Sequence, residues 1–66
     1  MQIFINGDPK TVDQGCTIAC LLDLLNVGRE RVAVEVNMDI VPKTAYGSHI
    51  LADGDKIEIV HFVGGG

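Results

Sequence analysis

The sequence predicts an α+β domain in which a single helix covers one face of a four- to five-stranded mixed sheet. The chain has 66 residues, which is room for one domain. Several short runs alternate between apolar and other residues, as strands do, and one central segment changes to the period of a helix. Because neighbouring strands lie on both sides of one helix in the sequence, a doubly wound parallel sheet is excluded.

The composition is typical of a folded protein with a small core. Hydrophobic residues make up 47% of the chain and charged residues 21%, which argues against a disordered segment. A domain of this length buries only about 60% of the surface of its unfolded chain. Little stability is then left to support an enclosed catalytic pocket. We therefore expect a protein that is not itself an enzyme.

The charge balance favours protein partners. Nine acidic residues against five basic ones give a net charge of −4. Lys and Arg do not cluster, so the basic patch that nucleic acids require is missing. The apolar stretches are too short to span a bilayer, and none follows a cationic start as in a signal sequence. We expect a cytoplasmic protein with no nucleic-acid or membrane partner.

A hairpin is expected at the amino end. The run MQIFI, residues 1–5, alternates and leads into Asn6 and Gly7, the strongest short hairpin signal. The following KTV, residues 10–12, is predicted to pair back as a second strand. Gly15 would close the connection to the next element.

The segment CTIACLLDLLNVG, residues 16–28, is predicted to contain the helix. Thr17 is expected to cap its amino end, and Gly28 to stop it. Four apolar residues recur at spacings of three and four, which places them on one helix face: Ile18, Leu21, Leu22 and Leu25.

Three more strand-like runs follow the helix. RVAVEV, residues 31–36, alternates clearly. IVPK, residues 40–43, is predicted to be a short edge strand, because Pro42 lacks the N–H that a central ladder needs. Residues 44–52 have no clear period and are predicted to be irregular, with room for one helical turn. KIEIVHFV, residues 56–63, is the last and most apolar strand.

The sheet face away from the helix is predicted to be a partner interface. Ile57 and Ile59 should face the helix with the first strand, which sends Val60 and Phe62 to the opposite face. Phe4 of the first strand points to that face as well. Three large apolar side chains on one water-facing surface suit the docking of another protein.

The cysteines and histidines are given no catalytic role. Cys16 and Cys20 are too few for a disulfide framework or a structural zinc site, so no metal is expected. Their spacing also differs from the Cys-x-x-Cys redox motif, and we expect them to be reduced and mostly buried. His49 and His61 have no evident nucleophile to serve.

The final residues, HFVGGG, predict a flexible tail behind a domain of residues 1–63. Gly64, Gly65 and Gly66 lack a Cβ, and three residues extend at most about 10 Å, enough to carry a carboxylate into a narrow active site. An α-carboxylate is unreactive until a partner activates it, for example as an acyl-adenylate that a sulfur or nitrogen nucleophile attacks. These residues therefore predict a carrier protein.

Several stretches together resemble the bacterial thiamine-biosynthesis sulfur carriers, a family of the ubiquitin-like β-grasp fold: MQIFING, VAVEVN, IVPK and DGDKIEIVHFVGGG. The resemblance covers essentially the whole chain. It implies that an E1-like adenylating enzyme uses ATP to activate Gly66, and that a cysteine-derived sulfur donor system then converts it to a thiocarboxylate. A thiazole synthase would receive the sulfur for the thiazole moiety of thiamine. No cofactor bound to the chain itself is implied.

Two other functions stay open on the sequence alone. The chain could carry sulfur for molybdopterin or another sulfur-transfer pathway. It could also be a non-covalent protein-binding module of β-grasp fold in which the glycine tail has no chemical role. Deletion of Gly66 separates the second alternative from a carrier, because only a carrier depends on that residue.

Overall fold

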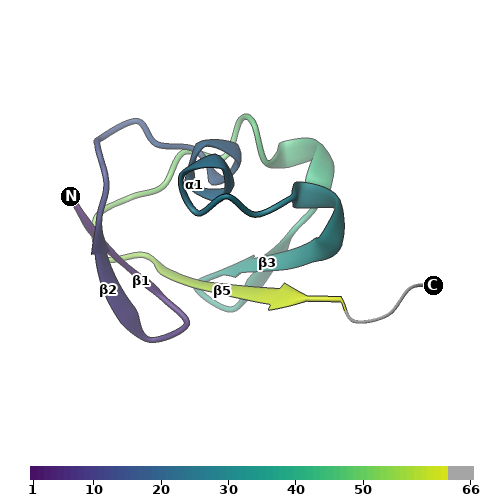
Figure 1. Ribbon diagram of the computed structural model, residues 1–66. Coiled ribbons are helices and arrows are strands. Elements are labelled where there is room, and N and C mark those ends of the chain that lie inside the picture. The colour runs from purple at the N-terminus through teal and green to yellow at the C-terminus, as the bar shows by residue number, and fades with distance from the viewer. Residues whose placement is uncertain (63–66) are drawn as a thin grey trace.

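The structure, a computed structural model, describes residues 1–62 of the chain. The predicted glycine tail, residues 64–66, lies outside the described residues, as does Val63 at the predicted end of the domain. The described residues form one five-stranded mixed sheet, and one α-helix crosses a single face of it (Figure 1). The predicted fold class is confirmed.

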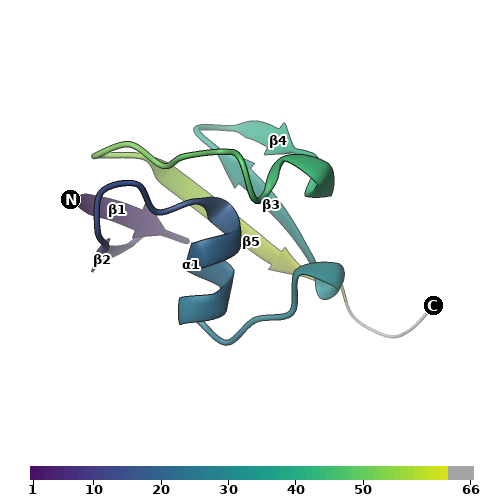
Figure 2. The ribbon, with the colours of Figure 1, turned by 90° about the horizontal axis from the view of Figure 1, so that it is seen from above.

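Five strands and one α-helix make up this fold, joined by two 3-10 turns: β1 (Gln2–Ile5), β2 (Asp8–Thr11), α1 (Ile18–Leu24), η1 (Arg29–Arg31), β3 (Val32–Val36), β4 (Asp39–Val41), η2 (Lys43–Ala45) and β5 (Lys56–His61). The strand order is β2-β1-β5-β3-β4. Strand β5 runs parallel to β1, and the other neighbours are antiparallel. The last strand therefore lies in the middle of the sheet, between β1 and β3 (Figure 2).

A tight turn shapes the first hairpin. Asn6 and Gly7 have φ of 49° and 89°, the left-handed conformation that a two-residue hairpin turn requires. Strand β2 then begins at Asp8, two residues before the predicted KTV run, and Pro9 lies opposite Phe4. Because β2 is at the sheet edge, the missing N–H of proline interrupts no central ladder.

The helix begins where the sequence predicts and ends earlier. The Thr17 hydroxyl accepts a hydrogen bond from the Cys20 amide at 3.1 Å, as an N-cap does. At the other end Asn26, with φ of 57°, is the left-handed residue, and the Val27 amide bonds to the Leu22 carbonyl at 2.9 Å. The prediction that Gly28 stops the helix is wrong, because Asn26 reverses the chain two residues sooner.

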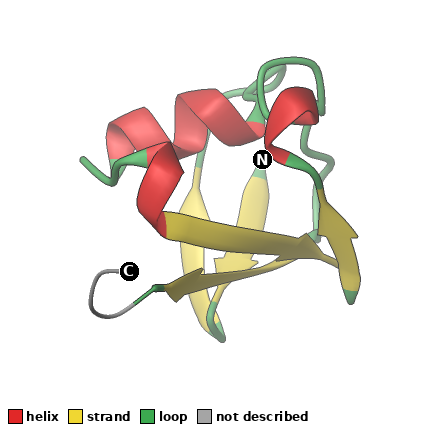
Figure 3. Cartoon of the chain, turned by 90° about the vertical axis from the view of Figure 1, so that its right-hand side faces the viewer, coloured by secondary structure: helices red, strands yellow, loops and turns green. Residues whose placement is uncertain are grey.

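All helical segments lie on one side of the sheet (Figure 3). We call the face that α1 covers the inner face and the opposite one the outer face. Ile57 and Ile59 are buried on the inner face, as predicted, while Val60 is exposed on the outer face. The predicted edge strand near residues 40–43 is β4, which lies at the sheet edge.

The core lies between α1 and the inner face. Its buried apolar side chains come from the helix, the strands and the connecting loops: Ile3, Val12, Cys16, Ile18, Ala19, Leu21, Leu22, Val32, Val34, Val36, Val41, Tyr46, Leu51, Ile57 and Ile59. Tyr46 is only 1% exposed although it belongs to the segment predicted to be irregular. Fully burying one large aliphatic side chain contributes about 1.5–3 kcal/mol, so a core of this size can stabilise a small domain.

The left-handed residue at the end of α1 gives a first prediction. Asn26→Ala should lower the free energy of unfolding by about 1 kcal/mol, because a Cβ without a compensating polar group disfavours this conformation. Asn26→Gly, the matched control, should stay within about 0.5 kcal/mol of the wild type, since glycine adopts positive φ readily. Urea unfolding measures both, and equal stability of the two variants would contradict the assignment of the helix end.

Candidate functional site

The described chain leaves the sheet at Phe62, one residue beyond β5. The Phe62 amide donates a hydrogen bond to the Arg31 carbonyl at 2.9 Å, and His61 pairs with Val32 in the β3–β5 ladder. The backbone is therefore bonded to its neighbour up to the last described residue. Gly66 follows four positions later in the sequence.

The other side of β5 is held by a side chain. The pairing of β1 with β5 reaches only to Ile5 opposite Ile57. Beyond it, the Asn6 amide group accepts a hydrogen bond from the Ile59 N–H at 2.9 Å and donates one to the Ile59 carbonyl at 3.2 Å. Asn6 thus continues the bonding of β5 where β1 has already turned away.

An apolar patch, formed by the exposed side chains of Val60 and Phe62, lies at this exit point. Val60 and Phe62 are 52% and 56% exposed, and Ala33 of β3 is paired with Val60. The ammonium group of Lys43 lies 5.9 Å from the centre of the Phe62 ring, within the range of a cation–π contact. The patch is therefore apolar, with a cation at its rim.

Phe4, the third predicted interface residue, lies at a different place on the outer face. It is half-buried and pairs with Lys56, four residues before Val60 along β5. At about 3.3 Å per residue, this offset is roughly 13 Å. Phe4 is therefore well separated along the sheet from Val60, whereas Val60 and Phe62 are two residues apart in the sequence and both are exposed. Gly64, Gly65 and Gly66 lie outside the described residues, and their predicted roles stay predictions.

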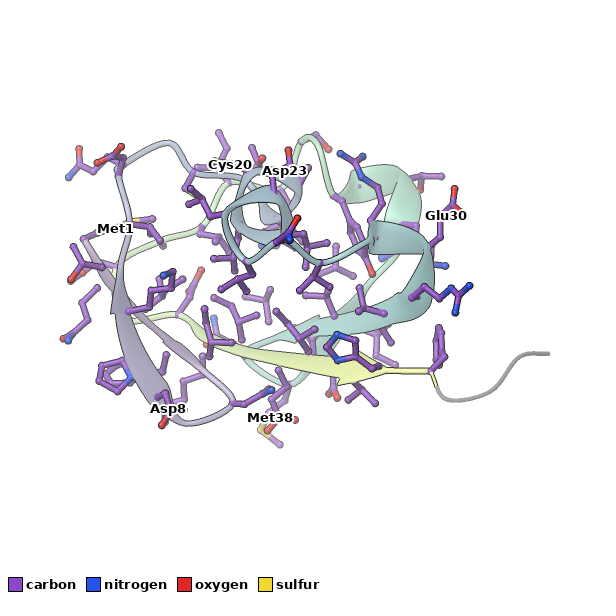
Figure 4. The ribbon with its side chains drawn as sticks, in the orientation of Figure 1. Met1, Asp8, Cys20, Asp23, Glu30 and Met38 are labelled. Carbon is purple, nitrogen blue, oxygen red and sulfur yellow. The ribbon has the colours of Figure 1, made fainter. Side chains whose placement is uncertain are left out.

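The two cysteines differ, in part against expectation. Cys16 is buried, but Cys20 is exposed on α1, so the prediction that both are buried is wrong for Cys20. Cys20 lies on the side of the helix that faces away from the sheet (Figure 4). Its backbone amide is the one that donates a hydrogen bond to the Thr17 cap. Burial, followed by hydrogen bonding with Cys20, raises the pKa of the Cys16 thiol from its ordinary value of 9.0 to about 11.

No helix within residues 1–62 is long and apolar enough to cross a membrane. In the same part of the chain, no group of three or more His, Cys, Asp or Glu side chains is placed to hold a metal ion. The features that single out this molecule are thus the central β5, its exit at Phe62 and the apolar patch beside that exit.

A five-stranded mixed sheet with its last strand in the centre and one helix on one face defines a protein of the ubiquitin-like β-grasp class. A crystal structure of the thiamine biosynthesis protein ThiS from Geobacter metallireducens superposes with a TM-score of 0.84, at 36% identity and over 100% of both chains. The model of the ThiS family matches residues 3–66. The chain belongs to the ThiS family.

Two curated relatives differ in length from one another. The sulfur carrier protein ThiS of Bacillus subtilis is 44% identical over 63 residues, which cover 94% of this chain and 96% of that protein. A thiazole synthase of Paramagnetospirillum magneticum is 46% identical over 66 residues, all of this chain and 20% of that protein. The chain thus spans about a fifth of the length of the thiazole synthases that it matches.

The buried thiol gives a second prediction. Between pH 9 and 11 the folded chain keeps the proton on Cys16 while the unfolded chain loses it. The contribution of this thiol to the free energy of unfolding is therefore complete below pH 9, and it is lost as the pH rises through about 11. The loss should be on the order of 3 kcal/mol, since each unit of the pKa difference corresponds to about 1.4 kcal/mol.

Urea unfolding across this pH range measures the effect. The readout is the difference in slope between the wild type and Cys16→Ala, which isolates the thiol from every group that the two proteins share. The variant should be less stable at every pH and lose less stability above pH 9. Cys20→Ser, which removes the exposed thiol, is the matched control and should keep most of the wild-type slope. Parallel curves for the wild type and Cys16→Ala would contradict the assignment.

Proposed function

We propose that this chain carries sulfur on Gly66, whose carboxylate is adenylated and then converted to a thiocarboxylate that supplies the thiazole moiety of thiamine. The match of residues 3–66 to the ThiS family carries the proposal, because it extends through all three final glycines. Membership of a thiamine family favours this pathway over a carrier for molybdopterin.

Two chemical steps are required, and both use partners. In the first, an oxygen of the Gly66 carboxylate attacks the α-phosphorus of ATP, and pyrophosphate leaves. In the second, a hydrosulfide equivalent from a cysteine-derived donor attacks the carbonyl carbon, and AMP leaves with the electron pair of the broken C–O bond. The product is a thiocarboxylate. ATP is bound by the adenylating enzyme, so this chain is a co-substrate with no catalytic residue of its own.

The position of β5 supports a carrier role in mechanical terms. An enzyme that draws Gly66 into its active site pulls on the strand from which residue 66 follows. That strand is bonded to β3 as far as Phe62 and to Asn6 at Ile59. A central strand bonded on both sides resists such a pull better than an edge strand, which has only one neighbour. The folded residues can therefore act as a handle, with residues 64–66 proposed as a flexible tail.

Two protein partners follow from this chemistry. An E1-like adenylating enzyme would activate Gly66, and a thiazole synthase would take the sulfur. The second partner is supported by the thiazole synthase of Paramagnetospirillum magneticum, because a fifth of that protein is similar to this chain. A cytoplasmic location, where ATP and both partners would be available, belongs to the same proposal.

Intact-mass measurement tests the chemistry. The chain incubated with the adenylating enzyme of its own organism, ATP and a cysteine-derived sulfur donor should gain the mass difference between one sulfur and one oxygen atom. A chain lacking Gly66 is the control, and it should gain nothing while keeping its fold. No mass change in the wild type, under conditions that sustain pyrophosphate release with a known ThiS protein, would contradict the proposal.

We further propose that the apolar patch of Val60 and Phe62 is the partner interface. Phe62→Ala should weaken binding to the adenylating enzyme about tenfold, a loss of about 1.4 kcal/mol, because a large aromatic anchor is removed. The stability of the free chain should change by less than about 0.5 kcal/mol, since this side chain is half exposed.

Phe4→Ala is the matched control for this interface. It removes the same side chain from the same sheet face, at a position paired with Lys56 and away from the patch. Titration calorimetry with the folded variants should show a smaller loss of affinity for Phe4→Ala than for Phe62→Ala. Unchanged affinity for Phe62→Ala would remove the patch from the interface.

A further inference from the structure

Two carboxylates lie directly opposite each other on the outer face. The β3–β5 register pairs Glu35 with Glu58, so both side chains point to the same face. The Cβ atoms of such a pair are about 4.5–5.5 Å apart, and like charges placed in this way destabilise a sheet. Within residues 1–62, neither carboxylate has an ion-pair or hydrogen-bond partner. The register therefore places two like charges opposite each other, with Lys56 two residues before Glu58 on the same face and bonded to neither carboxylate.

Exposed apolar side chains border this carboxylate pair on two sides. Val60 follows Glu58 on the same face of β5, and the apolar patch begins there. On the opposite side, Ile40 pairs with Glu35 and is 76% exposed, and Met38 is 90% exposed. Met38 lies on the far side of the sheet from Cys20 and Asp23 of α1 (Figure 4). The carboxylates are thus placed within a surface that a partner could bury.

The pair also lines a shallow hollow. Its walls come from the end of β3, the following turn and the start of β5: Glu35, Asn37, Met38, Lys56 and Glu58. The Asn37 side chain holds this turn in place, since it accepts a hydrogen bond from the Lys56 amide at 3.0 Å and donates one to Asp55 at 2.9 Å. The two carboxylates are therefore attached to backbone that is fixed from both sides.

The reach of the chain indicates which protein covers this surface. Gly66 lies four residues after Phe62, and four residues extend at most about 14 Å. An enzyme that acts on Gly66 must therefore place its surface close to Phe62. Glu58 is also four residues from Phe62, about 13 Å along β5. A standard interface covers about 800 Å² on each partner, which is broad enough to include both positions.

Resting on the proposed function, we propose that the adenylating enzyme covers the outer face and inserts a Lys or Arg side chain between Glu35 and Glu58. A single cation facing both carboxylates removes their repulsion, and a guanidinium can bond to two carboxylate oxygens at once. The contact that destabilises the free chain then stabilises the complex. Glu35 and Glu58 determine the specificity of docking and take no part in the chemistry at Gly66.

Pyrophosphate exchange by the adenylating enzyme, measured against the concentration of the carrier chain, tests the proposal. Glu58→Gln keeps the shape of the side chain and removes its charge. It should raise KM for the chain about tenfold with little change in kcat, because docking weakens while the reacting group is untouched. Glu35→Gln should act in the same direction. Added salt should raise KM for the wild type more than for either variant.

Asp23→Asn is the control, because it changes the net charge equally on the helix side of the molecule (Figure 4). Its KM should equal that of the wild type. The same variant should make the free chain more stable although it weakens docking. Glu58→Gln should raise the urea midpoint of unfolding, since the like charges no longer oppose each other. An interface residue with no such contact would show weaker docking without this gain in stability.

Three results would overturn the inference. The first is a KM for Glu58→Gln within twofold of the wild type. The second is an equal rise in KM for Asp23→Asn, which would indicate an effect of total charge, and the third is a lower urea midpoint for Glu58→Gln. If the wild-type chain supports pyrophosphate exchange and Glu58→Gln leaves KM unchanged, only this inference fails. If the wild-type chain supports no exchange, the proposed function fails as well.

Discussion

The bonding of β5 on both sides is the constraint on which the rest of the structure depends. All residues of β3 pair with residues of β5. Strand β1 is a parallel neighbour of β5 only at the start of β5. The Asn6 side chain takes over where β1 ends, with two hydrogen bonds to Ile59. As a result the chain stays attached to the sheet to within four residues of Gly66, and a load applied there falls on the middle of the fold.

The small size of the domain leaves one face of the sheet uncovered by the chain's own helix. A chain of 66 residues has one helix within its described part, and that helix can cover only the inner face. The core requires Ile57 and Ile59 to face inward, and it places no demand on the residues between them. The outer face can therefore hold an opposed pair of glutamates and exposed apolar groups, a combination that folding alone would not favour.

Alternation along the strands predicted most of the fold, because it reports directly which side of a strand is covered. It placed Ile57 and Ile59 inward and Val60 outward, and the structure confirms this. It could not place Tyr46, whose burial depends on contacts far away in the sequence and not on a local period. Nor could it separate Phe4 from Val60, because the offset between the parallel strands β1 and β5 is not encoded in either strand.

Under the proposed function, a sulfur carrier must leave its adenylating enzyme before it can deliver sulfur to a thiazole synthase. Val60 and Phe62 are only about half exposed, so they offer a limited apolar area for docking, as suits a complex that must dissociate. Charged contacts on such a surface speed encounter more than they prolong the complex. The proposed docking surface, with Val60 and Phe62 near Glu35 and Glu58, would therefore combine selectivity with rapid release, as successive use by two enzymes would require.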